Sequence, residues 1–393
     1  MRRPLAFLLR ATGLLWLWRL LHRRELLILT VHGVMDDTAR HAWQPLRQRI
    51  SPRRLDQALR VLRGHFAFVP LDEAVDMLAG VAPMRAHTAV LTFDDGYRNH
   101  VTHALPILRR QDVPATVFVA SGLVESPRPF WFDRLDYALQ HAQVGGMQVP
   151  VGGAVVELDA SSRDRLDRSF RAIRDEAKAA VRDDREMCRE LEALAARLEV
   201  ASGRALAPLQ EDDPWSAILT VDDLRSPSDP LRFGSHTVDH LRLHQLDPVV
   251  VADQLRRSKR SLEEWTGRPC EHFCYPDGGV SVQARDAVAS CGYRAAVTTR
   301  RGRNRQGDDL MMLRRIDLPA AGTTSELLVE ASGLLDALLN LRERLRDIGR
   351  VGRRTRGADG TPGLPDGGES AHRFGGEASS NAPASQARPA GLR

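Results

Sequence analysis

The sequence Ala89-Val-Leu-Thr-Phe-Asp-Asp-Gly96 is an apolar run that ends in two adjacent carboxylates and a glycine. A short apolar run of this kind, bounded by polar residues, is typical of a buried strand. Six more runs share this form: Leu26–Val31, Ala115–Ala120, Leu231–Gly234, His272–Tyr275, Arg294–Thr298 and Met312–Leu318. Amphipathic helical patterns such as Leu55–His65 and Val250–Thr266 separate most of them. Strands that alternate with helices predict a parallel sheet, and about seven strands favour an α/β barrel.

Polar residues follow several of these runs where the predicted strands end. His32 comes directly after the first run, Asp94 and Asp95 after the run quoted above, and His236 closely after the run at 231–234. Because the chemistry of α/β barrels gathers at the carboxyl ends of the strands, we expect these side chains to lie together. Loop solubility alone would not place acids and histidines after three different strands.

The histidines and carboxylates have the spacing of a metal site. His236 and His240 are four residues apart, so on one helical turn their imidazoles would share a face and bind one divalent metal. One carboxylate of the pair Asp94 and Asp95 would complete a triad that leaves metal positions open. The neighbouring carboxylate diverges from it and is free to act as a general base on water. Asp-Asp-Gly also suits a turn with a helix N-cap, and both descriptions can hold together.

Residues 123–230 interrupt the alternation of strands and helices. They contain a predicted hairpin, MQVPV-GG-AVVELD, and two charged helices at about 162–181 and 184–200 with repeated i,i+4 opposite charges. We interpret this segment as an insertion on the catalytic side of the barrel. It would act either as a lid that shapes the substrate site or as a structural brace.

The composition excludes several classes of protein. The chain has 393 residues, of which 42% are hydrophobic and 27% charged, which fits neither a disordered chain nor a multi-span membrane protein. Residues 1–24 contribute six arginines and no acid, and residues 350–393 contribute seven arginines and four acids. The whole chain has a net charge of +5, and the two ends contribute +6 and +3. The middle, residues 25–349, therefore has a net charge of −4. The net positive charge lies at the two ends, so we expect no nucleic-acid partner.

The ends of the chain differ in character from the middle. We expect a basic apolar helix over residues 1–24, the barrel over 25–349 and a disordered tail over 350–393. The longest uninterrupted apolar run near the start, Ala11–Trp18, has eight residues, far fewer than the ~20 that span a bilayer. No signal-peptide cleavage site follows it. The first segment would lie on an anionic membrane surface or pack against the barrel, which predicts a cytoplasmic or membrane-associated protein.

Four cysteines occur in the chain, at Cys188, Cys270, Cys274 and Cys291. Without a recognised export signal they are expected to be reduced thiols. Cys270, Cys274 and Cys291 lack the usual zinc-site spacing and an obvious fourth ligand. A small core residue is the favoured interpretation of Cys274, which lies within a predicted strand.

Two motifs resemble the polysaccharide deacetylases, the NodB-like carbohydrate esterases. Thr92–Gly96 reads TFDDG and Gly234–His240 reads GSHTVDH, as in the two signatures of that family, and Phe130–Leu135 resembles a segment of its long-insertion branch. The resemblance covers about residues 26–320. It implies a NodB-like deformed (β/α) barrel, in a circularly permuted branch whose first strand carries a YH-type motif.

The resemblance also implies roles for individual residues. Asp94 would be the general base, while Asp95, His236 and His240 would bind a divalent metal, usually zinc. The implied reaction is removal of the N-acetyl group from an amino sugar in a glycan or lipid-linked glycan precursor. The backbone N–H of Asp277 would stabilise the tetrahedral oxyanion.

The third motif of the family departs from its pattern in this chain. Cys274 stands where the family has an arginine that braces the catalytic aspartate, and Asp277 stands where it has tyrosine. We expect Arg314 or Arg315 to supply the bracing charge. No Leu-x-His motif follows the last strand, so His32 is the predicted general acid, as in permuted members.

Three further expectations complete the sequence-based interpretation. His244 is a less favoured metal ligand that is expected to face solvent. Removal of formyl or O-linked acetyl groups would need the same metal, base and acid. A barrel that binds glycan without cleaving it is the alternative outside the enzymes, and the oligomeric state is not predicted.

Overall fold

In the computed structural model, every described residue belongs to one unit that spans Met1–Leu341. The described residues are 2–35, 43–47, 49–142, 146–209, 211–226 and 229–338. The predicted tail at 350–393 and the last residues of the predicted barrel, 339–349, lie outside the described residues.

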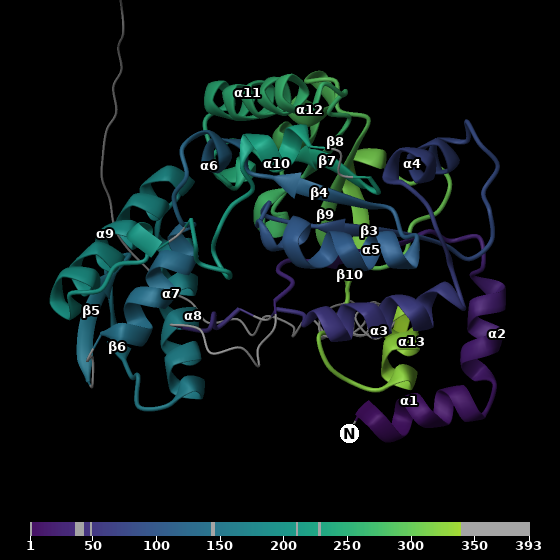
Figure 1. The fold of residues 1–393 in the computed structure, drawn as a ribbon, viewed down its shortest axis with the longest axis horizontal. Coiled ribbons are helices and arrows are strands. Elements are labelled where there is room, and N and C mark those ends of the chain that lie inside the picture. Colours follow the sequence, from purple (N-terminus) through teal and green to yellow (C-terminus); the bar gives the residue numbers. More distant parts are fainter. Residues whose placement is uncertain are drawn as a thin grey trace, which may run out of the picture. The chain divides into compact units, whose positions relative to one another are not determined.

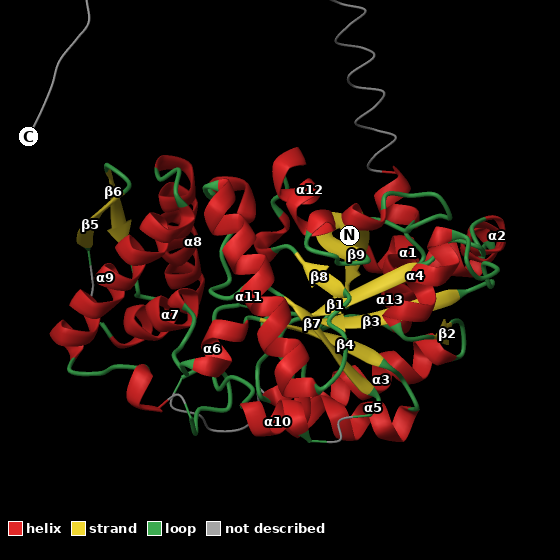
Figure 2. Cartoon of the chain, turned by 90° about the horizontal axis from the view of Figure 1, so that it is seen from above, coloured by secondary structure: helices red, strands yellow, loops and turns green. Residues whose placement is uncertain are grey.

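Seven parallel strands close into a barrel, in the order β1-β10-β9-β8-β7-β4-β3, with β3 pairing back to β1. The strands are β1 (Leu27–Val31), β3 (Thr88–Phe93), β4 (Ala115–Val119), β7 (Leu231–Ser235), β8 (His272–Cys274), β9 (Ala295–Arg301) and β10 (Leu313–Asp317). They radiate at the centre of a ring of helices (Figure 2). The predicted NodB-like α/β barrel of about seven strands is confirmed. An eighth strand, β2 (Ala67–Phe68), pairs outside the ring with β3 and was too short to predict.

Strands β1, β3 and β4 are almost entirely apolar because both of their faces are covered. Every residue of β1, β3 and β4 is buried, with one face toward the barrel interior and the other toward helices. The surrounding helices are α3 (Pro52–Arg63), α4 (Leu71–Ala79), α5 (Leu105–Gln111), α11 (Pro248–Thr266), α12 (Val282–Ser290) and α13 (Thr324–Ala331). Short helical turns are η1 (His100–Ala104), η3 (Leu243–Gln245), η4 (Pro276–Gly278) and η5 (Leu310–Met312). The two predicted amphipathic helices correspond to α3 and α11.

Most of the insertion between β4 and β7 stands to one side of the barrel, whereas its last helix lies beside α11 of the barrel (Figure 1). It consists of α6 (Ser121–Glu125), α7 (Trp131–His141), β5 (Met147–Val151), β6 (Ala154–Leu158), α8 (Arg163–Ala180), α9 (Asp184–Ser202), η2 (Ala207–Leu209) and α10 (Val221–Arg225). The predicted hairpin and both charged helices are therefore confirmed. The antiparallel hairpin packs on α8, and α7 packs on α9.

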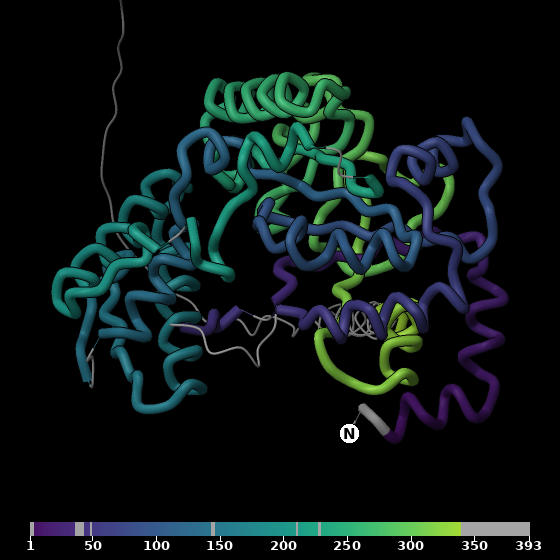
Figure 3. Tube along the Cα trace, in the orientation of Figure 1, coloured from purple at the N-terminus to yellow at the C-terminus, as the bar shows by residue number. Residues whose placement is uncertain are grey.

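The N-terminal segment forms two helices, which corrects the prediction of a single one. α1 (Arg2–Ala11) and α2 (Leu14–Leu21) meet at a 72° bend, where Gly13 adopts φ 75°. Glycine adopts this left-handed conformation without the Cβ clash that other residues incur. α1 packs on α13, so the two ends of the described chain lie side by side (Figure 3). None of the described helices alone is long and apolar enough to cross a membrane, and the bent pair meets that test only when both helices are taken together.

Candidate active site

A pocket of about 720 Å³, including its open mouth, lies at the carboxyl ends of the barrel strands. The barrel and its loops contribute His32, Arg47, Asp94, Asp95, His236, His240, Arg242, Tyr275, Asp277 and Thr299. The insertion contributes Trp131, Phe132, Phe170, Arg174, Lys178, Asp184 and Met187. All six predicted site residues thus line one pocket. The insertion forms a wall of this pocket, as expected of a segment that shapes the substrate site.

Asp95, His236 and His240 form a compact cluster of metal-ligating atoms, all within 4.8 Å of one another. Asp95 Oδ1 lies 3.7 Å from His236 Nε2 and 3.3 Å from His240 Nε2. The predicted helical turn is wrong, because residues 236–240 form an irregular loop. The histidines approach each other through backbone bends, with their ring centroids 4.8 Å apart and nearly perpendicular.

The backbone at this cluster is held in conformations that non-glycine residues rarely adopt. Asp95 has φ 77°, Thr237 has φ 66°, His240 has φ 57° and Asp277 has φ 59°. These are four of the six non-glycine residues with positive φ in the described chain. Left-handed conformations of this kind cost free energy and concentrate at functional sites, where the surrounding structure fixes them.

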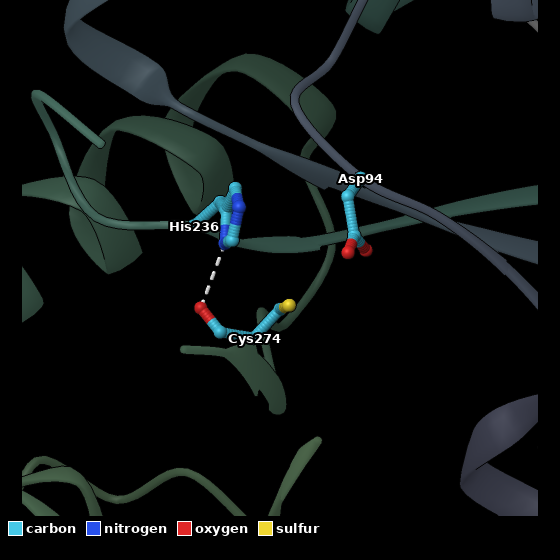
Figure 4. Close-up of side chains that lie close together, drawn as sticks. All are labelled: Asp94, His236 and Cys274. Carbon is cyan, nitrogen blue, oxygen red and sulfur yellow. Dashed lines mark hydrogen bonds between the residues drawn. The ribbon is translucent and has the colours of Figure 1, made fainter. Parts of the chain in front are cut away.

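Each histidine of the cluster is oriented by its surroundings. His236 Nδ1 lies 2.7 Å from the carbonyl oxygen of Cys274 and donates to it, so Nε2 is left unprotonated and faces Asp95 (Figure 4). Burial, and next the charge of His240, lower the pKa of His236 to about 4, which keeps the imidazole neutral. The rings of Phe130 and Phe132 pack edge-on against His240, at centroid distances of 5.2 and 5.6 Å.

Arg315 provides the bracing charge that the third motif lacks. Its Nη1 and Nη2 donate to Asp94 Oδ1 and Oδ2, both at 2.7 Å, and its Nε donates to the Thr298 carbonyl at 2.9 Å. Burial alone would raise the pKa of Asp94, but the charge and hydrogen bonds of Arg315 outweigh it and hold that pKa well below its usual range. Arg314 instead points away, toward Asp308 at 3.6 Å. Of the two predicted arginines, Arg315 therefore takes the bracing position.

Asp94, His236 and Cys274 form a second group with ligand atoms close together (Figure 4). Both oxygens of Asp94 already accept from Arg315, and Arg315 Nη2 lies 3.3 Å from Cys274 Sγ. A buried guanidinium at this position repels a second cation. Burial also raises the pKa of the Cys274 thiol, which opposes the thiolate form that metals bind. The Asp95 cluster is therefore the better metal site.

The donor set of the Asp95 cluster fits a divalent ion. Asp95 is 1% exposed, and its Oδ2 is a buried atom without a hydrogen-bond donor among the described residues. Its nearest cation is Arg47, whose Nη2 lies 3.5 Å from Oδ2 and whose guanidinium covers the Phe132 ring. One carboxylate and two imidazoles around an open pocket match the ligands that zinc uses in catalytic sites.

His32 lies beside Asp94 in the pocket. Its Nε2 lies 3.9 Å from Asp94 Oδ2, and its side chain is one-third exposed to the pocket. Burial lowers the pKa of His32, while the charges of Asp95 and Asp94 act against that effect. His100 Nε2 contacts the His32 carbonyl, and Asn99 Oδ1 accepts from the Val34 N–H at 3.0 Å. These contacts from η1 and the residue before it fix the loop that carries His32.

Asp277 lines the pocket from the loop after β8. A Cβ on Gly278, which has φ 71°, would come within 1.9 Å of Thr299 Oγ1, so only glycine fits beside it. The Asp277 carboxylate pairs with Lys178 of α8. The insertion is thereby tied to the loop that would stabilise an oxyanion.

A buried network supports the Asp94-Asp95 loop from the insertion side. The Tyr97 hydroxyl donates to Asp133 Oδ2 at 2.6 Å, and Arg49 Nη2 lies 3.3 Å from Asp133 Oδ1. The Arg49 guanidinium also stacks over the Tyr97 ring. Arg134, next along α7, pairs with Glu199 of α9 at 2.6 Å. These contacts give a physical role to the segment that resembles the long-insertion branch.

Sequence reasoning missed Arg47, Arg49, His100 and Lys178. Each acts through a partner distant in the sequence, and no local pattern marks it. His244 is exposed, as expected. All four cysteines are free thiols, and Cys274 is a buried strand residue.

Comparisons with known proteins agree with this geometry. The sequence profile described as polysaccharide deacetylase matches residues 82–153 and 224–296, which contain the acidic pair and both histidines of the site. The Streptococcus pyogenes deacetylase PplD in complex with acetate has a similar fold, with a TM-score of 0.50, 18% identity and coverage of 78% of this chain and 98% of its own. IcaB from Ammonifex degensii is compared with a TM-score of 0.49 and 19% identity, and the match covers 79% of this chain and 97% of its own. No curated protein matches significantly.

The barrel and its site define the class of protein as a deacetylase-type α/β barrel. The two matched segments identify a polysaccharide deacetylase domain in this chain. This family match supports the deacetylation of a glycan.

Proposed function

We propose that the protein is a metal-dependent hydrolase that removes the N-acetyl group from an amino sugar in a glycan or lipid-linked glycan precursor. The observation that carries the proposal is the pairing of two neighbouring carboxylates with different partners. Asp95 faces His236 and His240, whereas Asp94 is clamped by Arg315 and cannot turn toward them. Although the two residues are adjacent, Asp95 is therefore positioned as a metal ligand and Asp94 as a base.

A bound divalent ion such as Zn²⁺ would polarise the acyl carbonyl and lower the pKa of a water molecule. Asp94 remains ionised because Arg315 stabilises its charge, and its carboxylate keeps lone pairs free to accept a proton from that water. The Asp277 N–H would donate to the oxyanion of the tetrahedral intermediate. His32, 3.9 Å from Asp94, would deliver a proton to the leaving amine.

The walls of the pocket support a sugar substrate. Trp131, Phe132 and Phe170 present apolar rings, while Arg174 and Lys178 present polar groups from the same helix of the insertion as Phe170. Apolar walls with a few fixed polar groups are typical of small-molecule sites. An amino sugar has apolar ring faces and hydroxyl groups at its edges, which this combination suits.

Two other functions use the same pocket. A deformylase or O-acetyl esterase would need the same base, acid and metal. A non-catalytic glycan-binding barrel was suggested by Cys274 and Asp277, but the bracing charge lost at Cys274 is supplied by Arg315. The acid, base and ligand candidates are also all present, which favours catalysis.

The test is acyl release from amino-sugar substrates by the zinc-loaded protein. N-acetylglucosamine oligomers are compared with N-formyl and O-acetyl analogues, using wild type and Asp94→Asn. The proposal predicts acetate release that is lost in Asp94→Asn and retained in His244→Ala, a histidine substitution at an exposed position. Glycan binding without release of any acyl group would identify a binding barrel instead.

A further inference from the structure

The outer faces of α1 and α2 expose an unusual concentration of large apolar side chains. We call these residues the N-terminal apolar surface: Leu5, Phe7, Leu8, Leu14, Trp16, Leu17, Leu20 and Leu21. The remaining exposed large apolar residues of the described chain, also eight in number, are scattered singly from Val81 to Leu338. Isolated exposed apolar residues are normal, whereas a contiguous patch marks a surface that binds something.

This surface is exposed although the helices themselves are docked on the barrel. Leu15 is buried, Trp18 Nε1 donates to the Ser332 carbonyl at 3.0 Å, and Arg19 Nη2 donates to the His65 carbonyl at 3.0 Å. On α1, Ala6 is buried on the side that packs against α13. The inward residues thus hold the pair in place, so its apolar outer face is a fixed feature of the fold.

Positive charge accompanies the apolar surface. Arg10, Arg23 and Arg24 are exposed, and no acidic residue occurs in residues 1–24. The first acid, Glu25, is already paired with Arg305 at 2.6 Å. Arginines around an apolar face that includes an exposed tryptophan complement an anionic phospholipid surface. A second copy of the chain would instead bring like charges together across a two-fold interface.

The dimensions favour a helix pair that lies on a bilayer rather than crossing it. α1 has 10 residues and α2 has 8, so each is about 12–15 Å long, against a hydrocarbon core of about 30 Å. The 72° bend and the contacts of Trp18 and Arg19 with the barrel keep the two helices from forming one rod.

We propose that the N-terminal apolar surface binds the face of an anionic phospholipid bilayer, with α1 and α2 in the plane of the headgroups. The proposal is independent of the deacetylase chemistry. α2 leads into the start of β1, and the Arg23 carbonyl accepts from His87, which precedes β3. α2 therefore lies near the strand ends opposite the pocket, whereas Leu5 of α1 lies beside Pro319 and Ala321, which follow β10.

Vesicle flotation with the full chain tests the proposal. Vesicles of phosphatidylcholine alone are compared with vesicles that also contain phosphatidylglycerol. Wild type should float with the anionic vesicles, and high salt or Arg23→Ser/Arg24→Ser should weaken binding. Leu17→Glu/Leu21→Glu should weaken it by more than about tenfold, because each leucine loses its apolar contact. Val200→Glu/Val249→Glu changes two apolar residues elsewhere that are more exposed than these leucines, and this variant should bind like wild type.

A contact measurement keeps the test independent of how well the glutamate variants fold. Brominated lipids should quench the emission of wild type more than that of Trp16→Phe, since Trp16 is 67% exposed at the centre of the surface. Acetate release from a soluble substrate should be equal in both. Absence of wild-type flotation, or equal quenching in both proteins, overturns the proposal. So does a dimer in sedimentation velocity that Leu17→Glu/Leu21→Glu dissociates, since a second copy would then cover the surface.

Discussion

Replacement of Arg315 by methionine should destabilise the barrel far more than any exposed arginine substitution. Arg315 is 2% exposed and makes two hydrogen bonds of 2.7 Å to Asp94, one of 2.9 Å to the Thr298 carbonyl and one of 2.9 Å to Thr30 Oγ1. Methionine fills much of the volume but leaves the Asp94 charge buried without a partner. Breaking a buried ion pair in this way costs about 3–5 kcal/mol of unfolding free energy.

The pH dependence of the unfolding free energy provides a second test of the Arg315→Met prediction. In wild type, Arg315 lowers the pKa of Asp94, so this pair contributes stability above the unfolded pKa of about 3.9 and loses it as the pH falls through the folded value. In Arg315→Met, burial is no longer offset by the arginine and raises the pKa of Asp94 against the smaller effects of His32 and His236. The variant therefore loses stability as the pH rises, and its deficit relative to wild type should be larger at pH ~8 than at pH ~5.

Urea unfolding at both pH values measures the deficit. The matched control is Arg314→Met, the neighbouring residue, whose side chain is 49% exposed and pairs with Asp308 at 3.6 Å. An exposed pair of this kind contributes less than about 1 kcal/mol. Equal deficits for the two variants at pH ~8, or an Arg315→Met deficit that does not shrink in acid, would refute the reasoning.

Three further predictions concern other parts of the site. Burial raises the pKa of Asp136 of α7 to about 7, so the stability of its protonated form is lost as the pH rises from about 4 through 7. Asp136→Asn should therefore raise the thermal unfolding temperature at pH ~8 but not at pH ~4. Equal shifts at both pH values would contradict this prediction. Lys178→Met should lower the free energy of unfolding in urea by less than about 1 kcal/mol, because the pair of Lys178 with Asp277 is partly exposed. The same variant should slow acetate release, whereas Lys178→Arg should not. Cys274→Ser should keep its bound metal by elemental analysis; loss of the metal would favour the cluster that contains Cys274.

The barrel was predictable because most of its strands are largely buried and appear as apolar runs. The two-residue β2 carries no such run. In β10, Leu313, Arg315 and Ile316 are buried while Arg314 is exposed. Because the neighbours Arg315 and Ile316 are both buried, strict alternation does not select Arg315, and only the fold shows that it reaches Asp94.

The errors have equally physical causes. A spacing of four residues is shared by helical and irregular segments, so the loop at residues 236–240 was mistaken for a helical turn. The bend between α1 and α2 had a signal in Gly13, since glycine within a helical pattern often marks a break. The pairing of Lys178 with Asp277 joins residues 99 positions apart, and only the fold brings them together.

The central claim is that Asp95, His236 and His240 hold a metal beside a separate base, Asp94. Metal content and acetate release, measured on the same preparations, test it most directly. Wild type should bind one metal ion per chain and release acetate. His236→Ala should lose both, whereas Asp94→Asn should keep the metal and lose only acetate release. A His236→Ala protein that retains the metal, or an Asp94→Asn protein that releases acetate like wild type, would contradict the account.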